Sequence, residues 1–398
     1  MRPPRTAIVT FNLVAWDGRA QKVARSLAEA GWDAWLVGGS ETGRRETETL
    51  GRAHVVKLPG RIPADGWRRR HLIEFEEFDE VLDDLRPDVI HAHAVEALGL
   101  AVRVKRRAHG EGRVVTLVYD VHDYIAGVDR PDRTWRLAML VEEATHVASA
   151  DGVMTLSEPL ADLLEQRYEL AERPVVVTLA AELCPPVLAG ESESSDVRTD
   201  CGLGPDVGLL VYPGAVGPAR GLATVVAALP ELEDVHFALQ VIARHQYVGE
   251  VERQAEKLGV RDRLHVLPYV APHRIARYVR TASAGVIPLL HTPDHDLDLC
   301  NKYFDFMQAR LPMIVSDVKL QAETTARLGN GEVFRAGDVG SFAAATRTVL
   351  ANRERYAAAY DRPGVLERNS WEAQVPRLLE FYERVTGVAA VPSLVGAA

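Results

Sequence analysis

The sequence predicts an α/β protein built from two doubly wound domains, and three observations support that prediction. Short apolar runs, of the kind that buried parallel strands show, alternate with amphipathic helical patterns. The alternation occurs in two series, and the polar stretch ESESSDVRT at 191–199 separates them. The length of 398 residues, at roughly 150 residues per domain, fits more than one domain and fewer than four. We therefore expect domains at 1–190 and 200–370, and a final helix at about 371–386 that can pack back on the first domain.

The first series opens with the apolar run Thr6 to Leu13, followed by a helical pattern from Ala20 to Leu27 that Gly31 ends. Further strands are expected at 34–37, 55–56, 89–90, 114–119 and 153–156, with helices at 73–85 and 136–148. Strands that alternate with helices form βαβ units, so we expect a parallel sheet covered by helices on both faces.

The second series follows the same pattern. Its strands are expected at 209–212, 237–242, 264–267, 284–289 and 312–316, and its helices at about 221–229, 249–258, 272–281 and 301–309. Ligands of open α/β sheets bind at the carboxyl ends of the strands, so the strand-to-helix junctions are the first places to look for chemistry.

Composition narrows the function class. The net charge of -10 argues against nucleic acid as the main partner, because phosphate neutralisation needs a basic surface. No apolar run reaches the 18 residues of a membrane span, and the start MRPP is no secretory signal. Three widely spaced cysteines without a C-x-x-C pair fit a reducing cytoplasm. The chain has 40 arginines and 6 lysines, a bias of GC-rich genomes, so a lysine at a plausible site is the more informative residue.

The segment GAVGPARG, from Gly214 to Gly221, follows an expected strand and precedes an expected helix. Backbone N–H groups at such a helix start can hold a phosphate, and Arg220 can add charge-assisted bonds. The alternative is an ordinary glycine-rich turn that carries a solvated arginine.

The segment NKYFDFM at 301–307 is the strongest local unit. Lys302 and Asp305 are three residues apart and share one helical face, where the lysine suits a diphosphate and the carboxylate suits the hydroxyls of a ribose. The alternative is a surface salt bridge between the two.

Histidines close two strands of the first series. His91-Ala92-His93 ends one, and Asp120-Val121-His122-Asp123 ends another. These residue types could ligate a metal, but no helical H-E-x-x-H pattern or nearby cysteine supports one, so we expect no metal. No G-x-S-x-G elbow supports a serine hydrolase.

Two short basic stretches, WRRRH at 67–71 and RVKRR at 103–107, could contact a membrane or an anionic acceptor. Acidic residues follow the first, and membrane anchoring needs two signals, so a solvated surface is favoured and membrane association is not.

The order of these features resembles the GT-B glycosyltransferases, specifically glycosyltransferase family 4. Six segments carry the resemblance along most of the chain: the opening strand with Asp17-Gly18-Arg19, the helix with Lys22, Leu27-Ala28 and Gly31, RPDVIHAH at 86–93, VYDVHD at 118–123, ADGVMTLS at 150–157, and NKYFDFM through PMIVS at 301–316. The resemblance implies two Rossmann-like domains facing a central cleft. It also implies a nucleotide sugar held by the C-terminal domain, an acceptor bound mainly by the N-terminal domain, and retention of configuration without a metal.

The resemblance also implies roles for single residues. Arg220 takes the position that binds the diphosphate, Asp305 that of a ribose-binding glutamate, and His122 that of a histidine that contacts the donor sugar. We therefore expect catalytic roles for His122, Arg220 and Lys302. The expected donor-binding residues are Gly214, Arg220, Arg244, Asn301, Lys302 and Asp305, and the expected acceptor-side residues are Asp17, Arg19, His93 and Asp123.

Four positions depart from the family pattern. Asp305 is one methylene shorter than the usual glutamate, and Leu297 falls where the first acid of a paired-glutamate motif is expected. Val216 stands where a second cation is common, and Arg244 stands about where a glycine is expected. Arg244 could replace that cation or obstruct the donor site.

These observations predict a cytoplasmic, retaining, metal-independent glycosyltransferase that needs no cofactor. It would move a sugar from a nucleoside diphosphate sugar, with a UDP-sugar favoured, to a hydroxyl acceptor, in natural-product or glycan biosynthesis of a GC-rich bacterium. The acceptor could be a small molecule or lipid-linked. The alternatives are a non-hydrolysing nucleotide-sugar epimerase, with Asp120 and Asp123 as its candidate carboxylates, and a non-catalytic partner of an active transferase.

Overall fold

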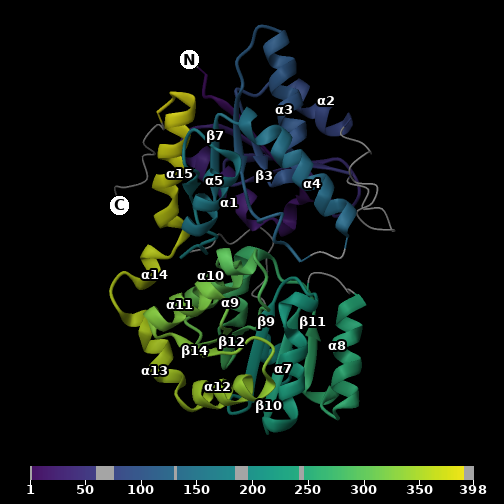
Figure 1. Cartoon of the computed structure of the whole chain (residues 1–398), viewed down its shortest axis with the longest axis vertical. Coiled ribbons are helices and arrows are strands. Elements are labelled where there is room, and N and C mark those ends of the chain that lie inside the picture. The colour runs from purple at the N-terminus through teal and green to yellow at the C-terminus, as the bar shows by residue number, and fades with distance from the viewer. Residues whose placement is uncertain (1, 60–75, 130–131, 184–195, 242–245, 390–398) are drawn as a thin grey trace. The chain divides into compact units, whose positions relative to one another are not determined.

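The computed structural model describes residues 2–59, 76–129, 132–183, 196–241 and 246–389, which form two compact units (Figure 1). Unit 1 comprises Met1–Thr178 and Gln374–Ala398, and unit 2 comprises Leu179–Ala373. The chain enters unit 2 before residue 190, the expected boundary, because Ala180 is already part of that unit's core.

Unit 1 holds an eight-stranded sheet in the order β3-β4-β2-β1-β5-β6-β7-β8, parallel except for the antiparallel pair β3–β4. The strands are β1 (Arg5–Leu13), β2 (Asp33–Gly39), β3 (Glu46–Leu50), β4 (Ala53–Leu58), β5 (Val89–His93), β6 (Thr116–Asp120), β7 (Gly152–Thr155) and β8 (Val175–Val176). The sequence did not predict β3 and β8. Strand β3 reads ETETL and is mostly exposed, so it carries no apolar run, whereas β8 has only the two residues Val175 and Val176.

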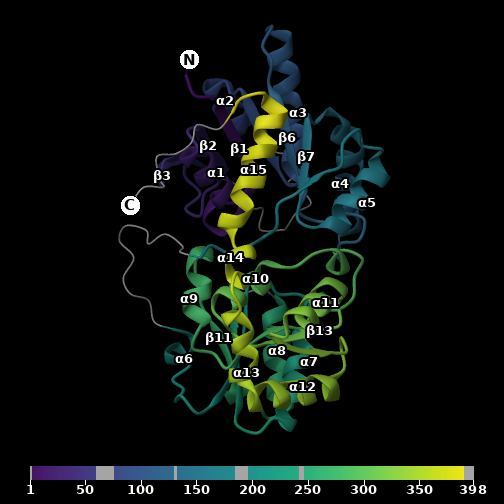
Figure 2. The same ribbon diagram turned by 90° about the vertical axis from the view of Figure 1, so that its left-hand side faces the viewer.

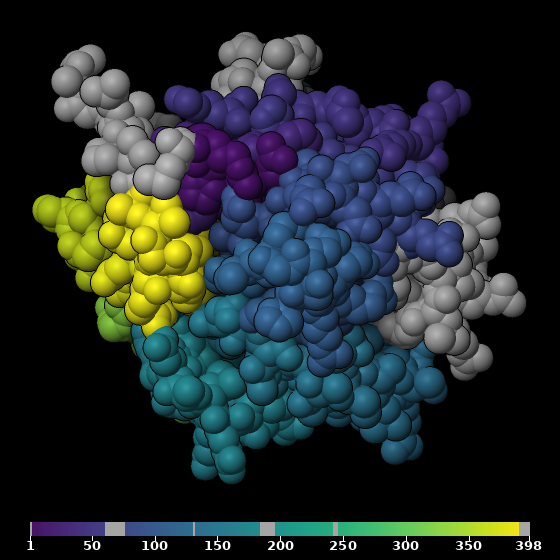
Figure 3. All heavy atoms as spheres, turned by 90° about the horizontal axis from the view of Figure 1, so that it is seen from above, coloured from purple at the N-terminus to yellow at the C-terminus, as the bar shows by residue number. Residues whose placement is uncertain are grey.

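The helices of unit 1 are α1 (Gly18–Glu29), α2 (Glu76–Leu85), α3 (Val95–Gly110), α4 (Arg133–His146), α5 (Glu158–Tyr168) and α15 (Trp371–Thr386), the last from Gln374 on. Helix α15 packs on the N-terminal part of this unit (Figures 2 and 3). The rings of Trp32 and Tyr382 meet edge to face at 5.5 Å. A Cβ at Gly152 would lie 2.9 Å from the ring of Phe381, so this glycine permits the close approach of α15 to β7.

Unit 2 holds a six-stranded, wholly parallel sheet in the order β11-β10-β9-β12-β13-β14. The strands are β9 (Gly208–Pro213), β10 (Val235–Gln240), β11 (Leu264–Leu267), β12 (Ala284–Ile287), β13 (Met313–Ser316) and β14 (Gly331–Phe334). The helices are α6 (Val197–Asp200), α7 (Leu222–Ala228), α8 (Gln246–Lys257), α9 (Ile275–Val279), α10 (Asn301–Gln308), α11 (Lys319–Leu328), α12 (Val339–Ala351), α13 (Arg353–Ala357) and α14 (Val365–Arg368).

The central strand β9 shows why this sheet is doubly wound. Leu210 and Tyr212 belong to the apolar core on one face, and Leu209 and Val211 belong to the core on the other. A strand buried on both faces reads as a continuous apolar run, and the sequence shows that run. The predicted fold class is confirmed for both units.

Candidate functional site

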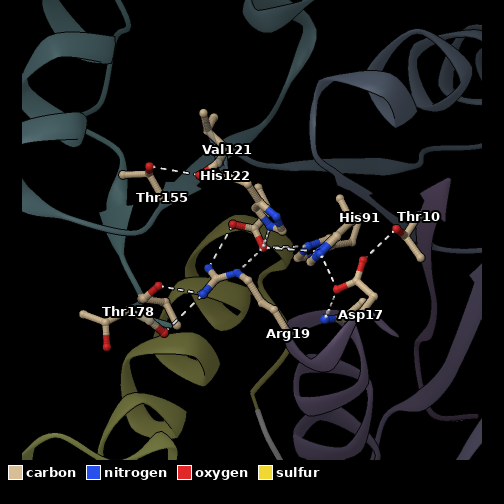
Figure 4. A network of polar contacts seen from close by, with 12 residues as sticks. Thr10, Asp17, Arg19, His91, Val121, His122, Thr155 and Thr178 are labelled. Atoms are coloured by element: carbon tan, nitrogen blue, oxygen red, sulfur yellow. Dashed lines mark hydrogen bonds and ion pairs between the residues drawn. The ribbon is translucent and has the colours of Figure 1, made fainter. Parts of the chain in front are cut away.

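Side chains from three neighbouring strands of unit 1 meet at the carboxyl edge of its sheet (Figure 4). His93 ends β5 and is in register with Asp120, which ends β6. His122 follows two residues later. After β1, the Asp17 carboxylate caps α1 by accepting a hydrogen bond from the backbone N–H of Ala20. The parallel arrangement thus brings together residues that are far apart in the sequence.

A buried ion pair lies at the centre of this cluster. The guanidinium of Arg19 donates to both oxygens of Asp120, with Nε to Oδ2 at 2.8 Å and Nη2 to Oδ1 at 2.9 Å. Its Nη1 donates to the carbonyls of Val177 and Thr178, at 2.8 and 3.2 Å. The side chains of Arg19 and Asp120 are 3% and 0% exposed, so the pair is removed from water and each charge depends on the other.

Three imidazoles surround the same carboxylate oxygen. Oδ2 of Asp120 lies 3.1 Å from Nε2 of His122, 3.4 Å from Nε2 of His91 and 3.6 Å from Nδ1 of His93. These three nitrogens are buried, and they contact the carboxylate by charge interaction without forming a regular hydrogen bond. Asp120 is therefore the point on which Arg19 and all three histidines converge.

The partners of His91 and His93 indicate where their protons lie. Nε2 of His93 is 3.0 Å from Oδ1 of Asp17, and a carboxylate only accepts, so the proton of His93 belongs on Nε2. Nδ1 of His91 is 2.7 Å from the hydroxyl of Tyr382, which can donate to it and leave the His91 proton on Nε2, facing Asp120. Oδ2 of Asp17 also accepts from the Thr10 hydroxyl at 2.8 Å and the Asn12 amide at 3.0 Å.

Burial and charge set the protonation of the cluster. Burial lowers the pKa of His91 and of His93 below the ordinary value, which favours neutral imidazoles. Burial would raise the pKa of Asp120, but the adjacent Arg19 charge holds it well below its usual range. For Asp17, burial also acts to raise the pKa. The charge interaction with His93 and the hydrogen bonds from His93 and Asn12 outweigh it, so the pKa lies below its ordinary value. Both carboxylates are therefore ionised at neutral pH.

Acidification from about pH 7.5 to about pH 5.5 is expected to destabilise unit 1. Because the folded-state pKa values of His91 and His93 lie below the ordinary 6.5, the unfolded chain binds more protons as the pH falls through 6.5. The expected loss is of order 1 kcal/mol per histidine. Chemical denaturation of the wild type and of His93→Gln at the two pH values measures it. The variant should lose less stability, and an equal loss in both proteins would contradict the assignment.

The cluster contains metal-ligand residue types. Ligand atoms of His91, His93 and Asp120 lie within 4.8 Å of one another. However, the fork of Arg19 already binds both oxygens of Asp120, and a divalent ion would share that buried carboxylate with a guanidinium charge. The group therefore fits a metal poorly.

The structure brings together four of the predicted residues of unit 1. Asp17, Arg19 and His93 are 7%, 5% and 1% exposed and bond to other buried groups, whereas the side chain of His122 is 17% exposed. Asp123 is half-buried and close enough to raise the pKa of Glu143, after the larger effect of burial.

Two members of this cluster, His91 and Asp120, were absent from the predicted site residues. Their signal was present in the sequence, because both belong to the strand-end motifs HAH and VYDVHD. What the sequence did not show is that Arg19 and Tyr382 are their partners.

In unit 2, the glycine-rich segment forms the junction between β9 and α7. Gly214 has φ +112° and Gly221 has φ +69°, and a Cβ at Gly221 would lie 1.7 Å from the carbonyl oxygen of Pro288. Gly221 is therefore required by the fold. Arg220 ends the short turn Pro218–Arg220, is half-buried and has no ion pair within the described part of the chain.

Lys302 lies beside this junction. It occupies the first turn of α10 and is 8% exposed, and its ammonium lies 4.7 Å from the ring centroid of Tyr212, at the end of β9. A Cβ on Gly214 would be 3.9 Å from its Nζ. No carboxylate pairs with Lys302 among the described residues, so the predicted alternative of a Lys302–Asp305 salt bridge is not formed.

The remaining donor-side predictions lie nearby or outside the described residues. Asn301 is the exposed first residue of α10, and Asp305 is half-buried one turn later. Arg244 lies outside the described residues.

Two of the positions that depart from the family pattern, Val216 and Leu297, lie in the described part of unit 2. Val216 packs against the apolar core, and Leu297 ends the turn His295–Leu297. The neighbouring Asp296 accepts from the backbone N–H of Lys319 at 3.0 Å and contacts His291 at 3.1 Å, so it ties this loop to the start of α11.

The basic stretch at 103–107 is compensated by acidic neighbours. Arg103 pairs with Asp79 at 2.9 Å, Lys105 with Asp151 at 2.6 Å, and Arg107 with Asp83 at 2.6 Å. The stretch at 67–71 lies outside the described residues. In the segments for which the structure gives positions, no helix has the length and apolar character of a membrane span.

Both halves of the chain match known family models. Residues 19–178 match the model described as Glycosyltransferase Family 4, and residues 208–352 match the model described as Glycosyl transferases group 1. The two matches together cover most of unit 1 and unit 2, in the order that the sequence motifs predicted.

Two similar sequences are D-inositol 3-phosphate glycosyltransferases. The protein of Geodermatophilus obscurus is 26% identical over 268 residues, which make up 64% of this chain and 56% of that protein. The protein of Xylanimonas cellulosilytica is 25% identical over 287 residues, 68% of this chain and 67% of that protein. The chain thus matches little more than half the length of the first of these relatives.

Solved structures share the fold at low sequence identity. Sucrose-phosphate synthase from Thermosynechococcus elongatus has a TM-score of 0.75 at 16% identity, over 96% of this chain and 99% of that one. Anabaena HepE in complex with UDP and glucose has a TM-score of 0.71 at 15% identity, over 96% and 100%. The chain thus has the GT-B fold, and its two halves match the glycosyltransferase models of Family 4 and of group 1.

Proposed function

We propose that the protein transfers a sugar from a nucleoside diphosphate sugar to a hydroxyl acceptor, with retention of configuration and without a metal or other cofactor. The observation that carries this proposal is the ammonium of Lys302, which is largely buried at the carboxyl edge of the unit 2 sheet. Among the residues with described positions, its contact is an aromatic ring and not a carboxylate. A buried cation without an anionic partner is costly unless a ligand supplies the opposite charge.

The groups around Lys302 suit a diphosphate. Gly214 keeps the backbone beside the ammonium free of a side chain, and Arg220 offers a planar set of donors in the same glycine-rich segment. When the nucleoside diphosphate departs, negative charge develops on its phosphates. Fixed cations stabilise that charge in the way that Mg²⁺ does in other folds.

We favour a UDP-sugar as the donor. HepE was solved with UDP-glucose, and the trehalose-phosphate synthase of Burkholderia xenovorans, which shares the fold at a TM-score of 0.64, is described as UDP-forming. In this chain the carboxylate of Asp305, one turn beyond Lys302, would accept hydrogen bonds from the ribose hydroxyls.

Unit 1 is proposed to bind the acceptor and to supply His122 to the donor sugar. Asp120 is paired with Arg19 and is not available as an acid or base, so it does not serve as a member of the carboxylate pair that the glycosidase scheme needs. The leaving phosphate would then help to deprotonate the acceptor hydroxyl. The same pairing weakens the epimerase alternative, which needs free carboxylates.

The acceptor is proposed only by class, as a small-molecule or lipid-linked hydroxyl compound of bacterial natural-product or glycan biosynthesis in the cytoplasm. The curated relatives are named for D-inositol 3-phosphate, so this polyol phosphate belongs in the first set of acceptors to be tested.

The test is incubation with a panel of nucleotide sugars, with and without candidate acceptors, while nucleoside diphosphate release and donor identity are followed. Release that rises with acceptor is the expected result. An isomerised donor would show an epimerase instead. A protein that binds no donor and turns none over would be the non-catalytic partner, and the proposal would fail.

A further inference from the structure

The buried residues predicted for the acceptor side need another role. Asp17, Arg19 and His93 are too enclosed to contact an acceptor directly, and each bonds to another member of the cluster around His122. His122 is the one histidine of this cluster with an appreciably exposed side chain. What the enclosed residues do to His122 is therefore the question that the geometry can answer.

Two neighbours fix the ring of His122. Its Nε2 is buried 3.1 Å from Oδ2 of Asp120. The ring of His93 meets the ring of His122 edge to face, with centroids 3.9 Å apart and an angle of 87° between the planes. Because a negative carboxylate attracts an N–H group and repels a nitrogen lone pair, Asp120 favours the tautomer of His122 with its proton on Nε2. Nδ1 is then the nitrogen left for a substrate hydroxyl.

The first turn of α1 holds both of these neighbours. Asp17 accepts a hydrogen bond from Nε2 of His93 at 3.0 Å, and Arg19 donates two hydrogen bonds to Asp120. Asp17 is itself fixed by Thr10, Asn12 and the backbone N–H of Ala20. Within the motif Asp17-Gly18-Arg19, Asp17 therefore holds His93 and Arg19 holds Asp120, the two residues that contact His122.

We propose that Asp120 and His93, held by Arg19 and Asp17, are positioning residues that fix the ring and the tautomer of His122. This proposal rests on the function proposed for His122, because it gives that residue its working orientation. It assigns the enclosed residues to the support of one imidazole instead of to contact with the acceptor.

A matched control lies in the same cluster. Tyr382 bonds to Nδ1 of His91 at 2.7 Å and is fully buried, but no contact joins it to His122 within the described chain. Tyr382→Phe removes a buried hydroxyl and so costs stability, but it removes no atom that contacts His122 and leaves the carboxylate of Asp120 and the ring of His93 in the protein. A role that is merely structural would make this variant behave like the others.

The experiment is side-chain ¹⁵N NMR of histidine-labelled full-length protein, with the His122 signal assigned from its loss in His122→Gln. The wild type should show the Nε2–H tautomer of His122. Asp120→Asn should abolish that preference, because the carboxylate is gone. Asp17→Asn keeps an oxygen that can cap α1, but it removes the negative charge that holds the proton of His93 on Nε2, so it should reduce the preference even where Asp120→Asn does not fold.

Steady-state kinetics complete the test. Both aspartate variants should lose about tenfold to a hundredfold in kcat with little change in KM for the donor, and Tyr382→Phe should keep the wild-type His122 signal and kcat.

A His122 signal unchanged in folded Asp120→Asn or Asp17→Asn would overturn the proposal, as would a Tyr382→Phe variant as impaired as they are. One divalent ion per purified chain, lost in His91→Gln, would overturn it too, since the imidazoles would then be ligands. If the tautomer depends on Asp120 but the wild type turns over no nucleotide sugar, the positioning stands and the proposed function fails.

Discussion

Replacing Arg220 by alanine is expected to lower kcat for nucleoside diphosphate release by about 100-fold to 1,000-fold. The guanidinium has no ion pair among the described residues, so the folded protein does not need it as a structural partner. Its loss removes donors from the leaving diphosphate, where charge grows in the transition state. Steady-state assays with the best donor of the panel measure the effect.

Arg253→Ala is the matched control for this prediction. Arg253 is an exposed arginine of α8 in the same unit, and its removal changes the net charge by the same amount. It should keep the wild-type kcat. A folded Arg220→Ala variant with wild-type rates would show that the diphosphate lies elsewhere.

Replacing Arg19 by methionine is expected to destabilise unit 1 by about 3–5 kcal/mol. The substitution keeps the apolar stem but leaves the charge of Asp120 buried, with no cation to compensate it. It also leaves the carbonyls of Val177 and Thr178 without their donor. Thermal and denaturant unfolding measure the loss.

Arg2→Met provides the comparison. The guanidinium of Arg2 also donates two hydrogen bonds to an aspartate: Nη1 to Oδ2 of Asp88 at 2.8 Å and Nη2 to Oδ1 at 2.9 Å. These two side chains, however, are 59% and 42% exposed. Solvent screens that pair, so its removal should cost less than about 1 kcal/mol. Equal losses from Arg2→Met and Arg19→Met would contradict the view that burial makes the Arg19–Asp120 pair essential.

The fold was accessible from the sequence because buried parallel strands leave apolar runs. The run LLVY in β9 and the run after Arg5 in β1 are enclosed on both faces, as the strands of a parallel sheet covered by helices are. Strand β3 and the antiparallel edge it forms carry no such run and were not predicted. The chain joins unit 2 at Leu179, ahead of the polar stretch at 191–199 that composition marks, and Ala180 packs in the core of that unit.

The candidate site was accessible only in part. Histidines and aspartates at predicted strand ends drew attention to His93, Asp120 and His122, which the structure places together. The scarcity of lysine drew attention to Lys302, which lies beside Gly214. Sequence spacing says nothing about partners across strands. For that reason Arg19 was expected to face an acceptor, whereas the structure pairs it with Asp120 in the interior.

The central claim, that Lys302 holds the diphosphate of the donor, is tested most directly by calorimetric titration of UDP into the wild type, Lys302→Met and Lys257→Met. Lys257 is an exposed lysine of α8 and serves as the control. We expect the wild type and Lys257→Met to bind UDP with the same Kd, and Lys302→Met to bind at least about tenfold more weakly, since one charge-assisted contact contributes roughly 1.4 kcal/mol or more. Equal affinity in all three proteins, or no binding of any nucleoside diphosphate by the wild type, would contradict the claim.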